Sequence, residues 1–146
     1  MLRWILILGL AAALSCAPNS DSQPTDMLSI TDTTLVALRE FRKEEKFRED
    51  MSVFYPGVVD ETSRVLYETQ VNQLLDRLIA ELPTTPSRDY VLECFRELLP
   101  AFDLADSEDQ DQVARYMERV MDIVGVDDSG GLLNQWRYGF DPTPAP

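Results

Sequence analysis

The sequence predicts an all-α protein with four main helices in a compact bundle and a short C-terminal helix. Apolar residues recur at helical spacing in four segments, and capping residues and prolines bound those segments. No stretch alternates apolar and polar residues in the manner of a half-buried strand. The chain has 146 residues, of which 45% are hydrophobic and 27% are charged. This balance is ordinary for one globular domain.

The first helix is expected to run from about Thr31 to Phe47, with Thr31 or Asp32 as its N-cap. Its second half, residues 39–50, holds five basic and five acidic residues. Such a mixture of charges is typical of a solvent-exposed helix face that carries ion pairs. The apolar residues at helical spacing in this segment are Leu35, Leu38 and Phe41.

The second helix is expected to follow a turn at residues 54–57, which read FYPG. In a type II turn, proline sets the φ of the first central residue and glycine supplies the positive φ of the second. Asp60 can then cap a helix that ends at about Leu82, before Pro83. Its predicted apolar stripe consists of Val65, Leu66, Val71, Leu74, Leu75, Leu78, Ile79 and Leu82.

The third helix is expected to begin at Thr85-Pro86, because proline suits the first helical position, and to be disrupted near Pro100. Its predicted inner face consists of Tyr90, Val91, Cys94, Phe95, Leu98 and Leu99.

The fourth helix is expected after an acidic loop. Ser107 and Gln110 have the spacing of a capping box, and Gly125 can form the C-cap. Residues 130–140 are expected to add a short last helix over the open end of the bundle. The apolar stripe of the fourth helix consists of Val113, Met117, Val120, Met121 and Val124, and the last helix contributes Leu132, Leu133, Trp136 and Phe140.

The N-terminal segment is expected to be a signal peptide. Residues 4–14 form an unbroken apolar run of eleven residues, which is too short to span a bilayer as a helix and matches the centre of a secretory signal. The segment resembles the signal of bacterial lipoproteins, in which an aliphatic–small–small–cysteine box precedes an acylated cysteine. Ala13-Leu14-Ser15-Cys16 stands in that place, with Ala13 and Leu14 swapped relative to the preferred order. Plain secretion and an uncleaved segment are the alternatives.

The lipoprotein resemblance implies that Cys16 carries a diacylglyceryl anchor, so that the membrane is one partner of the protein. The chain then divides into a signal peptide (1–15), a flexible tether (16–28), an all-α helical domain (29–141) and a disordered tail (142–146). The tether is rich in Pro, Ser, Asp and Asn and shows no apolar period. We therefore expect a lipid-anchored protein of the bacterial cell envelope, facing the periplasm or the cell surface.

The net charge of −13 argues against nucleic acid as a partner, because binding phosphates requires clustered Lys and Arg. A basic protein, a cationic ligand or a metal ion fits this sign better, although plain solubility explains it too. The sequence contains no histidine, which excludes Ser-His-Asp and Cys-His catalysis and histidine-ligated zinc. We predict no catalytic residue, no metal site and no cofactor, and we expect the protein not to be an enzyme.

Residues 103–111 hold five carboxylates and no basic residue. Calcium prefers oxygen ligands of this kind, but the spacing does not match the twelve-residue calcium loop, which needs a glycine at its sixth position and a glutamate at its twelfth. We interpret the stretch as an acid-rich helix N-terminus, with a metal site or a patch for a basic partner as alternatives.

Two further groups of residues have side chains that can act in catalysis, but their sequence positions favour structural roles. Cys94 lies on the apolar face of the predicted third helix, so we interpret it as a core residue. Carboxylate pairs one helical turn apart, such as Glu93/Glu97 and Glu118/Asp122, have arginines near them in sequence, so we expect exposed ion pairs.

The most suggestive candidate site is a set of aromatic residues with one arginine in loops and near the C-terminus. Tyr and Trp are favoured contact anchors at interfaces. We predict a partner-binding groove at one end of the bundle, with packing over the core as the alternative. Its residues are Phe54, Tyr55, Trp136, Arg137 and Tyr138, with Phe140 beside them.

The domain resembles a family of small all-α bacterial proteins of unknown function. The resemblance rests on the FYPG turn between two helices and on the closing GLLNQWRYGFDP, and it covers roughly residues 30–142. It implies a fold and no activity. From the acidity, the expected export and the lack of a catalytic set, we expect a protein-interaction module, such as an inhibitor or immunity-type protein for a basic partner. The alternative is a lipoprotein that binds a small ligand or a divalent cation.

Overall fold

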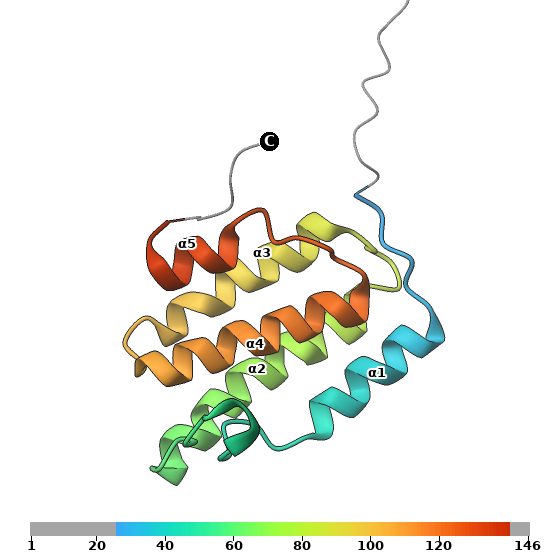
Figure 1. Cartoon of the computed structure of the whole chain (residues 1–146). Coiled ribbons are helices and arrows are strands. Elements are labelled where there is room, and N and C mark those ends of the chain that lie inside the picture. The colour runs from blue at the N-terminus through green and yellow to red at the C-terminus, as the bar shows by residue number, and fades with distance from the viewer. Residues whose placement is uncertain (1–25, 141–146) are drawn as a thin grey trace, which may run out of the picture.

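The computed structural model describes residues 26–140, which contain five α-helices and no strand (Figure 1). Signal peptide 1–15, Cys16, most of the tether and tail 142–146 lie outside the described residues. The predicted all-α bundle with a short C-terminal helix is confirmed. The helices are α1 (Asp32–Lys43), α2 (Glu61–Glu81), α3 (Arg88–Leu98), α4 (Ser107–Val124) and α5 (Leu132–Tyr138), with two short 3-10 helices, η1 (Met51–Val53) and η2 (Leu99–Phe102).

The four long helices share one apolar core. α2 packs against α1 and α3, while α4 packs against α1 and α5. α5 lies along one side of the bundle beside α4 (Figure 1), with Leu133 near the end of α4 and Arg137 paired with Asp111 near its start, rather than over an open end. Among the helices of residues 26–140, none is long and apolar enough to cross a bilayer. The central core residues include Leu38, Phe41, Val71, Leu75, Leu78, Val91, Phe95, Val113, Met117 and Val120.

Helix α1 ends at Lys43, four residues before the predicted end at Phe47. Glu44 takes an extended conformation, and Phe47 has a left-handed backbone with φ +60°. Lys46 and Phe47 are fully buried, so the prediction that this half is a solvent-exposed helix face is wrong for them. Tertiary contacts of these residues, described below, replace the last helical turn.

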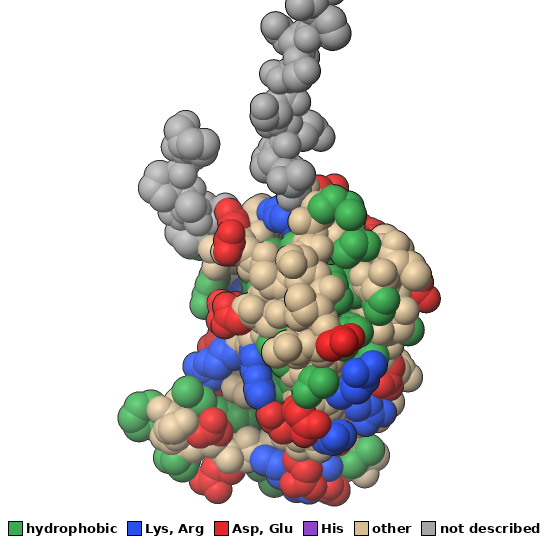
Figure 2. All heavy atoms as spheres, turned by 90° about the vertical axis from the view of Figure 1, so that its right-hand side faces the viewer, with side chains coloured by type: hydrophobic (Ala, Val, Ile, Leu, Met, Phe, Trp, Pro, Cys, Tyr) green, Lys and Arg blue, Asp and Glu red, His purple; other side chains and the backbone are tan. Residues whose placement is uncertain are grey.

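Several other charged side chains near the end of α1 form ion pairs, as predicted, although some of their partners lie outside α1. Arg42 Nε lies 2.9 Å from Asp76 Oδ1 of α2, and Lys43 Nζ lies 2.7 Å from Glu40 Oε1. Figure 2 shows basic and acidic side chains intermingled over the lower part of this face. Exposed pairs of this kind contribute little to stability, about 0–1 kcal/mol each.

Helix α2 has the predicted bounds, with Asp60 accepting a hydrogen bond from the amide of Ser63 as N-cap. The prediction that Val65 and Leu66 join its buried stripe is wrong, because their exposed fractions are 47% and 56%. The reason is geometric. Arg64, in the same turn of α2, is only 5% exposed, and Val65 and Leu66 lie about 100° and 200° from it around the helix axis. The side of this turn that faces the protein interior is therefore the one that carries Arg64.

Helix α3 begins at Arg88 after Ser87, which is its N-cap, rather than at the predicted Thr85-Pro86. The carbonyl of Pro86 instead accepts a hydrogen bond from the amide of Leu28 at 2.7 Å. Asp26 accepts hydrogen bonds from the hydroxyl of Ser87 and the amide of Asp89. Residues 26–28, which we expected in the tether, are therefore held against the start of α3.

Helix α4 has the predicted apolar stripe and ends at Gly125, whose φ is +81°. The predicted capping box is wrong: Asp106 is the N-cap, and the Gln110 amide donates to the carbonyls of Phe102 and Asp103. In α5, Leu133 is buried, and Leu132 and Trp136 pack against the core. Phe140 remains 59% exposed.

Candidate functional site

The structure joins two features that the sequence presents separately, the aromatic residues of the predicted groove and the acidic stretch 103–111. The hydroxyl of Tyr55 donates a 2.6 Å hydrogen bond to Asp109 Oδ1. Tyr55 is 1% exposed and Asp109 is 8% exposed. Burial raises the pKa of both groups, and the bond from Tyr55 partly opposes this rise in the pKa of Asp109. The pair fixes the 51–55 turn to the first turn of α4.

The C-terminal residues of the predicted groove reach the same helix end. Trp136 Nε1 donates a 2.8 Å hydrogen bond to Asp103 Oδ1. Arg137 forms an ion pair with Asp111, which raises the pKa of the guanidinium. Residues 109 and 111 point about 200° apart on a helix, so Tyr55 and Arg137 meet α4 from different sides. Asp111, the partner of Arg137, also lines the small hollow beside Phe54 and Tyr55. The two segments therefore contact neighbouring parts of one helix end, and the partner-binding groove stays a prediction.

Two members of the predicted set remain exposed. Phe54 is 84% exposed and Tyr138 is 56% exposed. Tyr138 lies near Phe140, with ring centroids 6.5 Å apart, whereas Phe54 has no ring contact with any residue in 26–140. Phe54 is thus the one aromatic member of the set that the fold itself does not use.

The acidic stretch 103–111 is largely occupied by its own protein. Asp103, Asp109 and Asp111 accept the bonds just described. Asp106 and Glu108 are exposed, as is Asp103. Within the part of the chain that the structure describes, no group of three or more Cys, Asp and Glu side chains could hold a metal ion. These contacts favour the interpretation as a helix N-terminus over the calcium alternative.

The other chemical candidates have structural roles. Cys94 is 1% exposed, and burial raises the pKa of its thiol, so the predicted core role is confirmed. Glu93 Oε2 lies 3.0 Å from Arg96 Nη1, and Glu97 pairs with Arg77 of α2. These carboxylates form the ion pairs that the sequence predicts.

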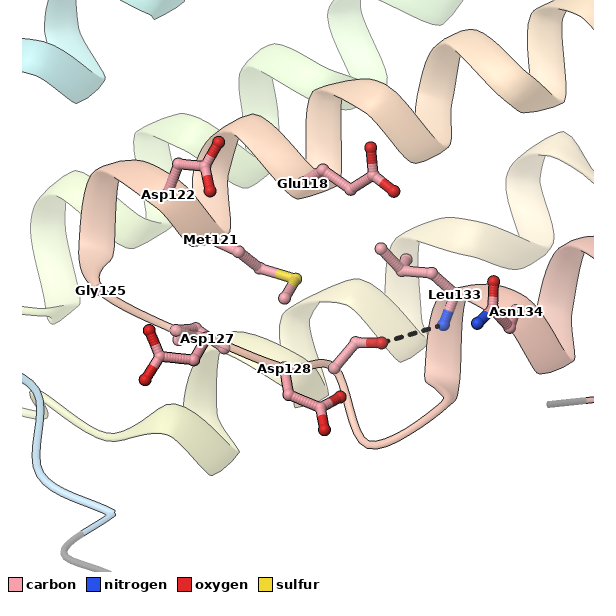
Figure 3. Close-up of a pocket in the computed structure, with 10 residues that line it drawn as sticks. Glu118, Met121, Asp122, Gly125, Asp127, Asp128, Leu133 and Asn134 are labelled. Carbon is pink, nitrogen blue, oxygen red and sulfur yellow. Dashed lines mark hydrogen bonds between the residues drawn. The ribbon is translucent and has the colours of Figure 1, made fainter. Parts of the chain in front are cut away.

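Glu118 and Asp122, by contrast, lie at a cleft of about 580 Å³ between the end of α4, the loop that follows it, and α5. Figure 3 shows these two side chains on α4, with Asp127 and Asp128 on the loop across the hollow. The cleft is lined by Glu118, Met121, Asp122, Gly125, Val126, Asp127, Asp128, Ser129, Leu133 and Asn134.

The lining of this cleft combines four carboxylates with a buried apolar floor. Met121, Val126 and Leu133 have exposed fractions of 7%, 4% and 6%. None of the described residues that line it is Lys or Arg. The loop is held in place from two sides: Asp128 Oδ1 accepts the amide of Gly130 at 2.6 Å, and the Asp128 carbonyl accepts Arg88 Nη2 at 2.9 Å. The site is suited to a cationic group with an apolar stem.

Comparison with known proteins places the chain in a family. The model of a domain of unknown function, DUF4844, matches residues 29–141. The chain belongs to this family. A solved structure of a DUF3571 family protein from Acinetobacter baumannii AYE is similar, with a TM-score of 0.66 and 28% sequence identity, over 73% of this chain and 89% of that chain. No curated protein matches the sequence. The predicted resemblance to an all-α family of unknown function is confirmed.

Sequence reasoning missed half of the acidic cleft of this DUF4844 domain. Glu118 and Asp122 were recognised as a pair one turn apart, but Asp127 and Asp128 were not connected with them. A usable signal was present: two acids follow the helix-ending Gly125 and precede Gly130-Gly131. Such a segment predicts a tight loop that folds back near the end of α4.

Proposed function

We propose that this protein is a non-catalytic interaction module that binds a basic partner protein, held at the bacterial cell envelope by an acylated Cys16. The envelope assignment rests on the sequence of residues 1–16. An inhibitor or immunity-type role is the form of this function that best suits a small acidic domain whose partner is basic. The partner-binding role rests on the acidic cleft.

One observation carries the proposal: the lining of the cleft includes Glu118, Asp122, Asp127 and Asp128, apolar residues at its floor and no basic residue. A Lys or Arg side chain of a partner fits this arrangement, because its methylene stem can lie on apolar surface while its charge faces carboxylates. Charge complementarity of this kind also accelerates association with the right partner.

The proposal is tested by crosslinking and pull-down with the full-length protein from bacterial envelope fractions. We expect a basic partner that is retained at about 50 mM salt and released at about 300 mM salt, because salt screens exposed charges. The double variant Asp122→Asn/Asp127→Asn should retain less of it. The matched control, Asp32→Asn/Glu81→Gln, removes the same charge from exposed positions away from the cleft. Equal retention by both variants would contradict the proposal.

The alternative function is binding of a small ligand or a divalent cation, and it makes a different prediction. The same cleft supports its small-ligand form for a cationic molecule, whereas the described residues offer no group of three or more carboxylates that could hold a metal ion. A ligand that binds the native state raises the melting temperature by mass action. A rise with millimolar calcium that Asp122→Asn/Asp127→Asn abolishes would favour this alternative over a protein partner.

A further inference from the structure

The strongest unexplained feature of the molecule is the tip of the 51–55 turn. Phe54 is 84% exposed and has a left-handed backbone with φ +57°. Non-glycine residues adopt this region rarely, and a large exposed apolar side chain gains nothing from it. Glycine would form the same turn without strain. The fold therefore does not account for phenylalanine here, which points to a role in binding.

Phe54 belongs to a larger surface. A cleft of about 470 Å³ runs between the start of α2 and the start of α4. Its lips include Val59 and Leu104, whose exposed fractions are 97% and 100%. Glu108 lines this cleft and also the small hollow beside Phe54, so the two are continuous. We call the combined surface the turn-end surface: Val53, Phe54, Val59, Asp60, Leu104, Asp106 and Glu108.

The charge of the turn-end surface identifies the chemistry of its occupant. Asp60, Asp106 and Glu108 are exposed, and the described residues that line the 470 Å³ cleft include no Lys or Arg. Arg115 lines the small hollow beside Phe54, so the combined surface has three exposed acidic side chains against this one basic side chain. Exposed apolar side chains beside carboxylates complement a segment that carries apolar residues and Lys or Arg. An anionic lipid surface would be repelled by the same carboxylates.

Two further observations concern the conformation of that segment and the position of the surface on the domain. Residues 26–140 contain no strand, so an extended segment finds no sheet edge to pair with, whereas an amphipathic helix satisfies its own backbone hydrogen bonds. The turn-end surface also faces away from the start of the domain: Figure 1 shows residues 26–31 (blue) at the opposite end of the bundle from the 51–55 turn. In Figure 2 this turn protrudes at the lower left, with hydrophobic side chains on it.

We propose that the turn-end surface docks a basic amphipathic helix of the partner protein, with Phe54 as its apolar anchor. This inference rests on the proposed function and extends it, because it assigns a second contact region at the opposite end of the bundle from residues 26–31. Anchor residues at interfaces contribute most of the binding energy when they are large and aromatic. Here the Tyr55–Asp109 bond fixes the turn beforehand, which reduces the cost of ordering it on binding.

The test measures fluorescence anisotropy of a labelled leucine–lysine peptide with helical amphipathic order, titrated with the full-length protein. Phe54→Gly should weaken binding about tenfold or more while leaving the melting temperature nearly unchanged. Leu104→Ser, at a fully exposed position, should weaken binding as well. Val36→Ala removes another exposed apolar side chain, on α1, and should bind like the wild type. A peptide of the same composition in scrambled order should bind more weakly.

The outcomes separate this inference from the proposed function. If Asp122→Asn/Asp127→Asn weakens binding and Phe54→Gly does not, the proposed function of the acidic cleft is retained. The proposal that the turn-end surface docks a helix is then overturned. If the wild type does not bind the peptide at about 50 mM salt, both are overturned. A third outcome is that the protein sediments with neutral phosphatidylcholine vesicles, that Phe54→Gly abolishes this sedimentation, and that the peptide does not bind. This outcome would also overturn the inference and would indicate that Phe54 binds lipid.

Discussion

Two phenylalanines, Phe47 and Phe54, share the same rare backbone conformation in opposite surroundings. Phe47, with φ +60°, is fully buried, and its ring centroid lies 5.5 Å from that of Tyr67 and 5.2 Å from that of Tyr116. Phe54, with φ +57°, is 84% exposed. A left-handed residue costs roughly 1–2 kcal/mol. Packing offsets this cost at Phe47 and not at Phe54, so the same strain indicates folding at one position and binding at the other.

The surroundings of Phe47 explain why α1 stops early. Its amide donates to the hydroxyl of Tyr116 at 2.8 Å. The Lys46 ammonium donates to the carbonyls of Phe41 and Glu44 at 2.8 and 3.0 Å. The buried guanidinium of Arg64 donates to the Lys46 carbonyl at 2.9 Å. These bonds satisfy the backbone groups that the missing helical turn would have paired.

The largest expected effect is that of Phe47→Gly. Glycine relieves the strain but removes the buried ring, so the free energy of unfolding should fall by about 3–4 kcal/mol, near the usual cost of removing a core phenylalanine. Urea unfolding measures this loss. A loss below about 1 kcal/mol would mean that the aromatic cluster around Phe47 is not a source of stability, and the comparison with Phe54 would fail.

Lys46 gives the buried segment a pH dependence of its own. Burial lowers the pKa of its ammonium to about 8 from an ordinary value of 10.5. Between these values the unfolded chain binds more protons than the folded one, so the free energy of unfolding rises with pH. Relative to Lys46→Met, the wild type should gain about 2 kcal/mol between pH 7 and pH 10.

This difference between the two proteins is measured by urea unfolding at several pH values. Cys94 and the tyrosines, whose pKa values are raised, act in the opposite direction at high pH but are present in both proteins and cancel. Parallel curves for wild type and Lys46→Met would show that the Lys46 ammonium keeps its ordinary pKa.

Tyr55→Phe tests the link between the turn and the core. It leaves the buried carboxylate of Asp109 without its 2.6 Å partner, which should cost about 1–3 kcal/mol in thermal or urea unfolding. Tyr138→Phe removes a hydroxyl from a residue that is 56% exposed and serves as the control, with an expected change within about 0.5 kcal/mol. Equal effects would indicate that the Tyr55–Asp109 bond does not hold the turn.

The smallest expected effect is that of Phe54→Gly on stability. The relief of left-handed strain and the greater freedom of glycine in the unfolded chain oppose each other, so the net change should stay within about 1 kcal/mol. Phe47→Gly and Phe54→Gly make the same substitution in the same backbone conformation, so a difference between their effects reports the burial of the ring. A loss of more than about 2 kcal/mol would show that the Phe54 ring packs in solution.

Sequence reasoning succeeded where local chemistry decides the structure. The Asp60 cap, the end of α4 at Gly125 and the apolar stripe of α4 follow from neighbouring residues alone. It failed where partners are distant in the chain. The end of α1 depends on Glu68, 22 residues from Lys46, and on Tyr116, 69 residues from Phe47.

The same distinction applies to the candidate sites. The chemistry of single residues predicts the groove, whereas the structure brings Tyr55, Trp136 and Arg137 to the acidic stretch 103–111 through contacts 26 to 54 residues apart. No local pattern connects Tyr55 with Asp109 or Trp136 with Asp103. By contrast, the exclusion of histidine chemistry needed only the composition.

The contact between residues 26–28 and the start of α3 has a mechanical consequence. If Cys16 is fixed in a membrane and a partner pulls on the domain, the load enters the bundle at residue 26. The bonds from Leu28 to Pro86 and from Arg88 to Asp26, at 2.7 and 2.8 Å, carry it directly to α3 before it reaches α1. These bonds must break before the pulling force can separate α1 from the core.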